Sequence, residues 1–290
     1  MCYQCVAIPT ITIQLLVTSI SLILGQRVFY KKSERKWLKR ITFAITILIS
    51  LVLSCFGIFL LILKSNNDYR DRNFANLCTR KGLKGSALDE HRCSILQQGG
   101  VTGNVLEFGP GPGTNFKCLQ NYTSSELQSI NKYVAVEPNS YFEEEMRKEH
   151  TVRGLAEHFP LTFVALKGEE VDDVSSNEYD VVILTHVLCS VDSVESVLAN
   201  AERALKSGGR IIFMEHVVAD TQTLLWYSQQ FLVAPILNIV GNGCQFRSLK
   251  DDIESYSGDR FNMDIIEFEA PLPVFMFFAR PHIKGILSRK

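Results

Sequence analysis

The stretch Val105–Gly113 constrains the fold of this chain more than any other part of the sequence. It reads Val-Leu-Glu-Phe-Gly-Pro-Gly-Pro-Gly, so an apolar strand containing Glu107 runs into three alternating glycines, Gly109, Gly111 and Gly113. Glycine lacks a Cβ and tolerates positive φ angles, so such a turn lets the backbone approach a ligand closely. With a helical segment expected from Asn115, the pattern is typical of dinucleotide and nucleoside binders.

A second acid narrows the choice of ligand. The apolar run Tyr133–Val136 ends at Glu137, and an acid at the end of a second strand can accept both ribose hydroxyls of an adenosine group. A dinucleotide turn places its third glycine three positions after the second, whereas the glycines here alternate. The alternating turn resembles motif I of the class I methyltransferases, which contacts the amino-acid part of S-adenosylmethionine. An ordinary tight turn of an α/β fold is the alternative interpretation.

Hydrophobic residues are unevenly placed along the 290 residues, whose net charge is −1. That charge gives no electrostatic argument for nucleic acid as a partner. Residues 1–26 and 41–63 contain no charged side chain, and about 20 apolar residues span a bilayer as a helix. We therefore expect a membrane anchor of one or two helices in residues 1–64, a linker and helix in 65–98, and a catalytic domain in 99–290. A buried core helix is the alternative for Ile41–Leu63.

The loop 26–40 between the two apolar segments carries seven basic residues and one acid. The positive-inside rule places such a loop in the cytosol, and two full spans would then put the rest of the chain in the lumen, away from cytosolic S-adenosylmethionine. A first segment that does not span, or a monotopic Ile41–Leu63 anchor, would resolve this conflict, and we expect a cytosol-facing domain. The sequon Asn121-Tyr122-Thr123 tests this orientation of the domain, because only a lumenal site is glycosylated.

The eight cysteines show no disulfide framework. Cys2 and Cys5 form a single Cys-x-x-Cys pair, which is too little for a zinc site, so the sequence predicts no metal. Cys189 is expected to pack as a small hydrophobe.

Beyond the linker, apolar strands alternate with helical segments. Continuous apolar strands such as Val181–Leu184 suit a parallel sheet buried on both faces, and the alternation predicts an open α/β sheet. Phe261–Glu269 and Val274–Arg280 are expected to close it as a final antiparallel hairpin. Ligands of such sheets bind beyond the carboxyl ends of the strands.

Polar side chains follow the later strands at that edge. Glu169 is the candidate for reading the adenine edge, with a solvated surface turn as the alternative. Thr185 and His186 follow the fourth strand, where the transferred methyl group should point. His216 ends the fifth strand, and histidine has a pKa suited to deprotonating a nucleophile near neutral pH. His216 is the first candidate base and His186 the second, and a structural role is the alternative for both.

Several runs make the resemblance more specific, namely Val187–Val191, Ala204–Gly209, Met214–Val217 and Arg280–Gly285. They resemble the membrane-anchored thiol S-methyltransferases, the methyltransferase-like 7 family. The resemblance implies a class I methyltransferase fold, an N-terminal anchor in endoplasmic reticulum or lipid droplets, and S-adenosylmethionine-dependent methylation of small lipophilic thiols. It implies Glu107 as the motif I acid and Glu137 as the ribose acid.

Two departures from that family concern the cofactor site. Its strand-two acid is typically Asp, where this chain has Glu137, and its turn usually carries Cys and Thr in place of Pro110 and Pro112. The apolar segment Leu224–Val240 is expected to cover the acceptor pocket, with plain packing as the alternative. Two further functions stay open, namely methylation of a lipid or quinone oxygen or nitrogen, and a non-catalytic membrane protein.

Overall fold

The computed structural model describes residues 36–79, 88–171 and 176–290. Within these residues a seven-stranded sheet has the order β3-β2-β1-β4-β5-β7-β6. The first five strands are parallel, and β7 is antiparallel to both of its neighbours. This is the class I methyltransferase sheet with its final antiparallel pair, as predicted. The strands are β1 Gly103–Phe108, β2 Ile130–Val136, β3 Leu161–Val164, β4 Tyr179–Thr185, β5 Leu205–His216, β6 Phe261–Glu269 and β7 Pro281–Arg289.

One strand of the predicted hairpin was wrong. Val274–Ala279 forms the 3-10 segment η6, and the strand that pairs with β6 is Pro281–Arg289. Val274 and Phe275 are 80% and 75% exposed, so their apolar character does not reflect burial in the sheet. The side chains that bury β7 in the core are Ile283 and Leu287.

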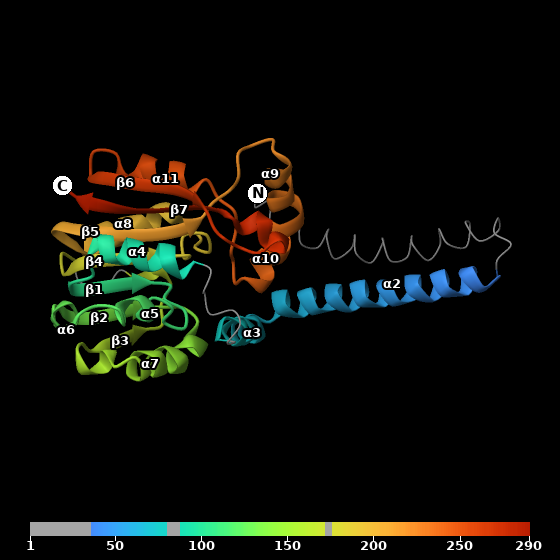
Figure 1. The fold of residues 1–290 in the computed structure, drawn as a ribbon, viewed down its shortest axis with the longest axis horizontal. Helices are drawn as coiled ribbons and strands as arrows, with labels where there is room; N and C mark the ends of the chain where they lie inside the picture. Colours follow the sequence, from blue (N-terminus) through green and yellow to red (C-terminus); the bar gives the residue numbers. More distant parts are fainter. Residues whose placement is uncertain (1–35, 80–87, 172–175) are drawn as a thin grey trace.

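Helices cover both faces of the sheet (Figure 1). Alternate residues of β1 point to opposite faces, because successive side chains of a strand do so. Val105 joins the core beneath α4, α5 and α7, whereas Leu106 and Phe108 join the core beneath α8 and α11. These helices are α4 Asp89–Gly99, α5 Phe116–Leu119, α7 Glu143–Val152, α8 Val194–Ala204 and α11 Leu249–Ser257, with short α6 Ser124–Gln128, η2 Ser140–Phe142, η3 Leu155–Glu157 and η4 Gly168–Glu170 between them.

The segment between the anchor and the sheet holds more structure than predicted. Besides α4, it forms α3, Asn67–Thr79, whose polar sequence gave no periodic signal. The expectation of no disulfide was also wrong, because Cys93 of α4 and Cys118 of α5 are bonded, with Cα atoms 4.9 Å apart. The two helices pack together in the same core, which brings these two thiols together.

The helix α2, Lys36–Ser65, projects from the domain (Figure 1) and covers the predicted apolar segment Ile41–Leu63. In the part of the chain that the structure describes, Arg40–Ser65 is the one helix with the length and composition to cross a membrane. Its end packs on the domain through Leu60 and Leu63, which contact Ile239. The other predicted segment, Val6–Gly25, lies outside the described residues.

The predicted helical stretch Leu224–Val240 consists of three consecutive pieces. They are α9 Leu224–Tyr227, the π-helical η5 Ser228–Val233 and α10 Ala234–Val240. Pro235 lies in the first turn of α10, where a missing N–H costs least. The name cap is used below for residues 224–240.

Candidate active site

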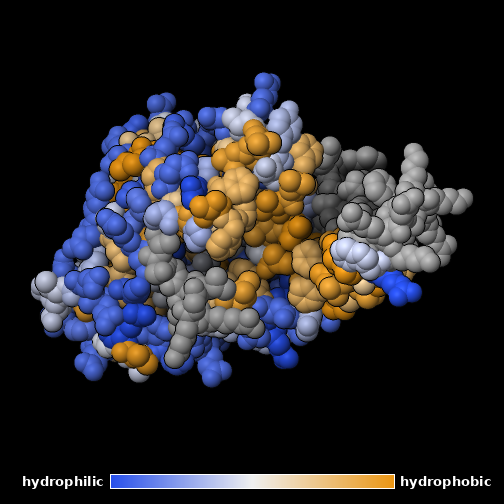
Figure 2. All heavy atoms as spheres, turned by 45° about the vertical axis from the view of Figure 1, so that its right-hand side comes forward, coloured by the Kyte–Doolittle hydropathy of each residue, from blue (hydrophilic) through white to orange (hydrophobic). Residues whose placement is uncertain are grey.

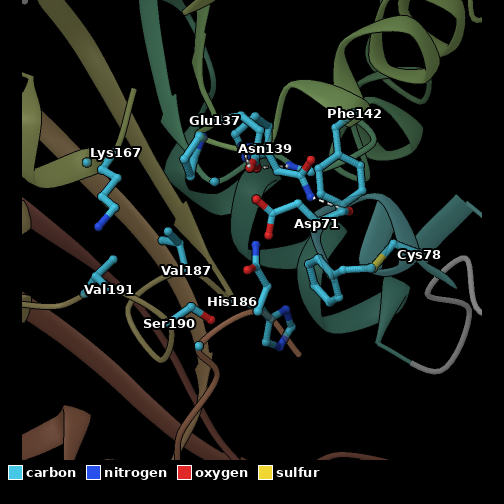
Figure 3. A pocket seen from close by; sticks show the side chains of 18 of the residues that line it. Asp71, Cys78, Glu137, Asn139, Phe142, Lys167, His186, Val187, Ser190 and Val191 are labelled. Atoms are coloured by element: carbon cyan, nitrogen blue, oxygen red, sulfur yellow. Dashed lines mark hydrogen bonds between the residues drawn. The ribbon is translucent and has the colours of Figure 1, made fainter. Parts of the chain in front are cut away.

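A cavity of about 660 Å³ opens beyond the carboxyl ends of β1, β2 and β4 (Figure 3). Its volume lies within the range of small-molecule sites, about 300–1,000 Å³. Six of the residues expected to bind cofactor or act in catalysis line it, namely Gly109, Gly111, Glu137, Glu169, Thr185 and His186. Glu107, Gly113 and His216 are not part of this wall.

The glycine turn after β1 adopts a backbone that only glycine accommodates easily. Gly109, Gly111 and Gly113 have φ angles of 63°, 55° and 80°. A Cβ on Gly109 would lie 2.5 Å from the Cγ2 atom of Val187, whereas one on Gly111 would meet no atom within 4 Å. The turn therefore packs tightly against the β4 loop at Gly109 and presents bare backbone to the cavity at Gly111.

Glu137 at the end of β2 is held by two backbone amides. Its Oε2 accepts a hydrogen bond from Gly111 N at 3.1 Å, and its Oε1 accepts one from Asn139 N at 2.9 Å. Burial raises the pKa of Glu137 to about 7, although the same two hydrogen bonds oppose the rise. Each carboxylate oxygen has capacity for a second hydrogen bond, so the group can still accept from a ligand in the cavity.

Glu107 lies behind the turn and is 1% exposed. It accepts hydrogen bonds from Asn115 Nδ2 and Tyr133 Oη, and Asn115 also donates to Thr185 Oγ1 at 2.9 Å. Burial raises the pKa of Glu107 to about 7, against the lowering effect of both hydrogen bonds. Asn115, just before α5, is thus tied to β1 through Glu107 and to β4 through Thr185, and any effect of Glu107 on a ligand passes through this network.

Glu169 joins two segments of the cavity rim. Its Oε1 accepts hydrogen bonds from Asp192 N at 2.6 Å and Ser193 N at 3.3 Å. It thereby ties η4 to the residues that lead into α8. Lys167, which the sequence did not single out, also lines the cavity and donates to Asp192 Oδ2 at 2.9 Å.

His186 begins a chain of hydrogen bonds whose direction can be assigned. Arginine can only donate, so Nδ1 of His186, 3.5 Å from Arg92 Nη2, is the acceptor. His186 Nε2–H then donates to His282 Nε2 at 3.1 Å, and His282 Nδ1–H donates to the Arg280 carbonyl oxygen at 2.9 Å. Burial, aided by Arg92 and His282, holds the pKa of His186 well below its usual value. Burial likewise lowers the pKa of His282 to about 4, so both imidazoles are neutral near pH 7.

His216 faces another group of side chains. Its Nε2 lies 2.9 Å from Cys244 Sγ, which lies 3.6 Å from Cys189 Sγ. Cys189 is buried in the core, as the sequence predicted. The neighbouring Glu215 Oε1 accepts the N–H groups of Val187 and Leu188 at 2.8 and 2.9 Å, so the end of β5 holds the loop after β4 in place.

Residues of α3 form part of the cavity that sequence reasoning missed. Asp71, Phe74 and Cys78 line it, and Figure 3 shows Asp71 beside Asn139 and Phe142, with Cys78 farther along α3. The Asp71 carbonyl oxygen accepts from Asn139 Nδ2 at 2.9 Å. The one sequence signal for this contact was Asn-Ser after the second strand, a helix-capping pair that indicates an ordered turn beside Glu137.

Comparisons with known proteins agree with this geometry. A family model described as a methyltransferase domain matches residues 71–251. Human thiol S-methyltransferase TMT1A is 31% identical over 186 residues, which cover 63% of this chain and 69% of the human protein. Rat (Rattus norvegicus) thiol S-methyltransferase TMT1B is 34% identical over 187 residues, which cover 62% and 68% of the two chains.

Among solved structures, YcgJ of Bacillus subtilis superposes with a TM-score of 0.54 at 12% identity, covering 69% of this chain and 98% of that one. This likeness shows a shared fold. Because the relatives exceed 30% identity over more than two thirds of their length and the methyltransferase model spans most of the domain, the chain belongs to the thiol S-methyltransferase family and is an S-adenosylmethionine-dependent methyltransferase.

Proposed function

We propose that the cavity binds S-adenosylmethionine and that this protein methylates the sulfur of small lipophilic thiols at a membrane surface. The observation that carries the proposal is that Glu137 and His186 line the same cavity, with the glycine turn between the strands that bear them. An acid for the sugar and a neutral base for the acceptor are thereby available to one bound ligand pair.

The residues present fit the cofactor. The bare backbone at Gly111 leaves open space where a side chain would otherwise project, which suits close approach by the amino-acid end of the ligand. Glu137 accepts the ribose hydroxyls, and Glu169 lies at the adenine edge. Thr185, held by Asn115, marks the position of the methyl group. When bound, S-adenosylmethionine supplies a methyl group already activated by a sulfonium centre.

We assign the base to His186, acting beside Arg92. A free thiol has a pKa of about 8.5, and only its thiolate attacks well. The guanidinium of Arg92 favours the thiolate, and Nδ1 of neutral His186 takes the proton when the acceptor thiol replaces the 3.5 Å contact between Nδ1 and Arg92. Arg92 is buried and also paired with Asp89 at 3.2 Å, which keeps its position fixed. His216, the other expected candidate, faces Cys244 and does not line the cavity.

The chain's own contribution to rate is then mainly alignment. Holding two reactants in a reactive geometry can lower a barrier by about 7–11 kcal/mol. The cavity walls from β1, β2, β4 and α3 fix the donor, and the loop after the cap, Gly241–Gly243, also lines the cavity. The cap therefore leads directly to the acceptor side of the site.

Exposed apolar side chains support action at a membrane. Figure 2 shows an apolar area on the side of the domain from which α2 projects, and the cap contacts both η6 and α2. Leu224 is 84% exposed, Leu232 67% and Phe275 75%, and large exposed apolar patches mark membrane or partner contacts. In our proposal α2 anchors the chain in endoplasmic reticulum or lipid droplets, the domain faces the cytosol, and acceptors dissolved in lipid enter beside the cap.

Methyl-labelled S-adenosylmethionine tests this function with the purified full-length protein in detergent. An alkyl thiol, the alcohol and the amine of the same chain length, and a quinol should be offered in parallel. We expect label in the thioether alone, and none with the Glu137→Ala protein. Label on oxygen or nitrogen would favour the lipid or quinone alternative. Absence of calorimetric cofactor binding would favour a non-catalytic protein.

A further inference from the structure

Three ligating side chains converge at one place outside the cofactor cavity. Cys189 follows β4, His216 ends β5 and Cys244 follows α10. Their sulfur and nitrogen atoms all lie within 4.8 Å of one another, and Cys189 and His216 are buried whereas Cys244 is partly buried. Cys244 Sγ is central, 2.9 Å from His216 Nε2 and 3.6 Å from Cys189 Sγ. The name three-ligand cluster is used below for these three residues.

We propose that the three-ligand cluster binds one zinc ion, which joins the three segments that carry its ligands. This site goes beyond methyl transfer and does not depend on which acceptor the enzyme uses. The expectation from the sequence that the chain lacks a metal site rested on the Cys2–Cys5 pair. It could not detect a cluster whose members are far apart in the chain.

The donor set suits zinc. Zinc binds cysteine sulfur at about 2.3 Å and histidine nitrogen at about 2.0–2.1 Å in tetrahedral sites. Tetrahedral geometry then separates two sulfurs by about 3.8 Å and a sulfur and a nitrogen by about 3.5 Å. The observed sulfur separation of 3.6 Å is close to the first value. The Cys244–His216 pair, at 2.9 Å, has to open by about 0.6 Å, and the Cys189–His216 pair, which lies within 4.8 Å, has to close by up to about 1.3 Å.

Charge also favours zinc over two separate thiolates. A zinc ion with two thiolates and one neutral imidazole has no net charge, so the complex avoids most of the cost of burying ions. Binding breaks two S–H bonds and forms two Zn–S bonds, releases two protons to solvent and changes no oxidation state. Among the described Cys, His, Asp and Glu side chains, these three form the group, so they supply three of the four ligands of a tetrahedral site.

The site's position gives it a structural consequence for the cavity. Ser190 and Val191, next to Cys189, line the cavity, as do Gly241–Gly243, next to Cys244. The backbones already meet through Gln245 N and the Cys189 carbonyl oxygen, 3.0 Å apart. Zinc at the cluster would lock these two walls to each other and to β5.

Metal content tests the proposal directly. The full chain should be purified under a phosphine reductant, in a Cys2→Ser/Cys5→Ser background that removes the terminal thiol pair. It is then equilibrated with Zn²⁺, freed of excess metal and measured by mass spectrometry. We expect about one ion per chain, and loss of that ion in Cys189→Ser and Cys244→Ser. The matched control is Cys78→Ser, a free cysteine outside the cluster.

Co²⁺ replacement gives a second readout. Cobalt should produce the thiolate charge-transfer and intense visible bands of a tetrahedral sulfur site, absent in Cys244→Ser. Circular dichroism shows whether each variant is folded. If a serine variant does not fold, the Cys189→Ala protein, once shown to be folded, is used in its place. Zinc content that is unchanged by every cluster substitution would overturn the proposal. So would a metal-free chain in which peptide mapping finds a Cys189–Cys244 disulfide that survives the reductant, distinct from the Cys93–Cys118 bond.

Discussion

His186 Nε2 lies 3.1 Å from Nε2 of His282, so a single proton is shared between two neutral imidazoles. His282 comes from β7, directly opposite His216 of β5 in the sheet register. The contact leaves the lone pair of His186 on Nδ1, on the side of Arg92. The antiparallel end of the sheet thereby fixes the tautomer of a residue that follows β4.

Substituting His186 tests this assignment. We expect His186→Gln to lower kcat for an alkyl thiol by about 10²–10⁴-fold near pH 7, the usual contribution of a general base. The variant should lose less with an acidic aromatic thiol, which ionises without help. Its rate with the alkyl thiol should rise about tenfold per pH unit until the thiol titrates near 8.5. The wild type should stay active to lower pH, since the pKa of His186 is held well below 6.5.

The control for that experiment is His158→Gln, which changes a histidine outside the cavity wall. Cofactor affinity, measured by calorimetry, should be unaffected in both variants. An equal loss of rate for alkyl and aromatic thiols would show that His186 positions the acceptor without removing its proton.

Cofactor affinity should depend on pH through Glu137. Burial raises its pKa from 4.5 to about 7, and a ribose diol binds the ionised carboxylate, which accepts from both hydroxyls. Below that pKa one oxygen carries a proton and no longer accepts. The dissociation constant should therefore fall as pH rises from about 6 to about 8, by at most about tenfold per unit. Calorimetric titrations at both pH values give the measurement.

Two variants test whether Glu137 causes this pH dependence. Glu137→Gln should bind more weakly and lose most of this pH dependence. Glu137→Asp should keep it, because the charge and both acceptor oxygens remain. If the glutamine variant retains the wild-type affinity and the same pH profile, Glu137 is not the ribose acceptor.

The glycine turn predicts a graded response to alanine. Gly111→Ala places a residue with φ of 55° in open space, so its cost in stability should be only the left-handed backbone penalty, about 1–2 kcal/mol. Because Gly111 lines the cavity, the added Cβ should also weaken cofactor binding. Gly109→Ala adds a contact of 2.5 Å with Val187 and should destabilise the fold further while abolishing cofactor binding. Thermal unfolding and calorimetry separate the two effects.

Gly154→Ala is the matched reference for those glycines. Its φ is 73°, a Cβ there also meets nothing within 4 Å, and it lies outside the cavity. It should lose stability as Gly111→Ala does, yet bind cofactor normally. Equal stability of the Gly109 and Gly111 variants would contradict the tight packing against Val187.

The sequence predicted the parts of the site that local patterns encode. Apolar runs ending in Glu107 and Glu137 mark buried parallel strands, and their carboxyl ends meet at one edge of the sheet. The same logic located Thr185 at the end of β4 and His186 directly after it. What it could not decide is where each acid points. Glu107 shares the face of Val105, so it turns into the core and supports the turn from behind.

Contacts between distant segments account for what was missed. The polar sequence of α3 gives no hydrophobic period, although Asp71 closes one side of the cavity. His282 and Arg92 reach His186 from β7 and α4, and no local motif records that meeting. The false strand at Val274–Arg280 arose because an exposed apolar surface and a buried strand have similar compositions.

Glu107 should make stability depend on pH. Its pKa is raised by burial from 4.5 to about 7, so between those values the folded state binds more protons than the unfolded chain. Stability is therefore greatest at the acidic end of this window and falls as pH rises through it, by up to about 3 kcal/mol. Glu137 contributes in the same direction. Melting temperatures of Glu107→Gln at about pH 5 and about pH 8 should differ less than those of the wild type.

The orientation of the domain can be tested at Asn121, which is exposed in the turn after α5. Disulfides are rare in the cytosol, so a cytosol-facing domain should keep Cys93 and Cys118 reduced in cells, and the bond that joins them in the structure should form only after oxidation. We expect both thiols to be alkylated when cells are lysed directly into denaturant and alkylating reagent without reductant, because Cys118 is buried in the folded domain, and we expect Asn121 to carry no glycan. A co-expressed lumenal glycoprotein serves as the positive control. A glycosidase-sensitive mass shift that Asn121→Gln removes, together with an intact Cys93–Cys118 bond, would place the domain in the lumen.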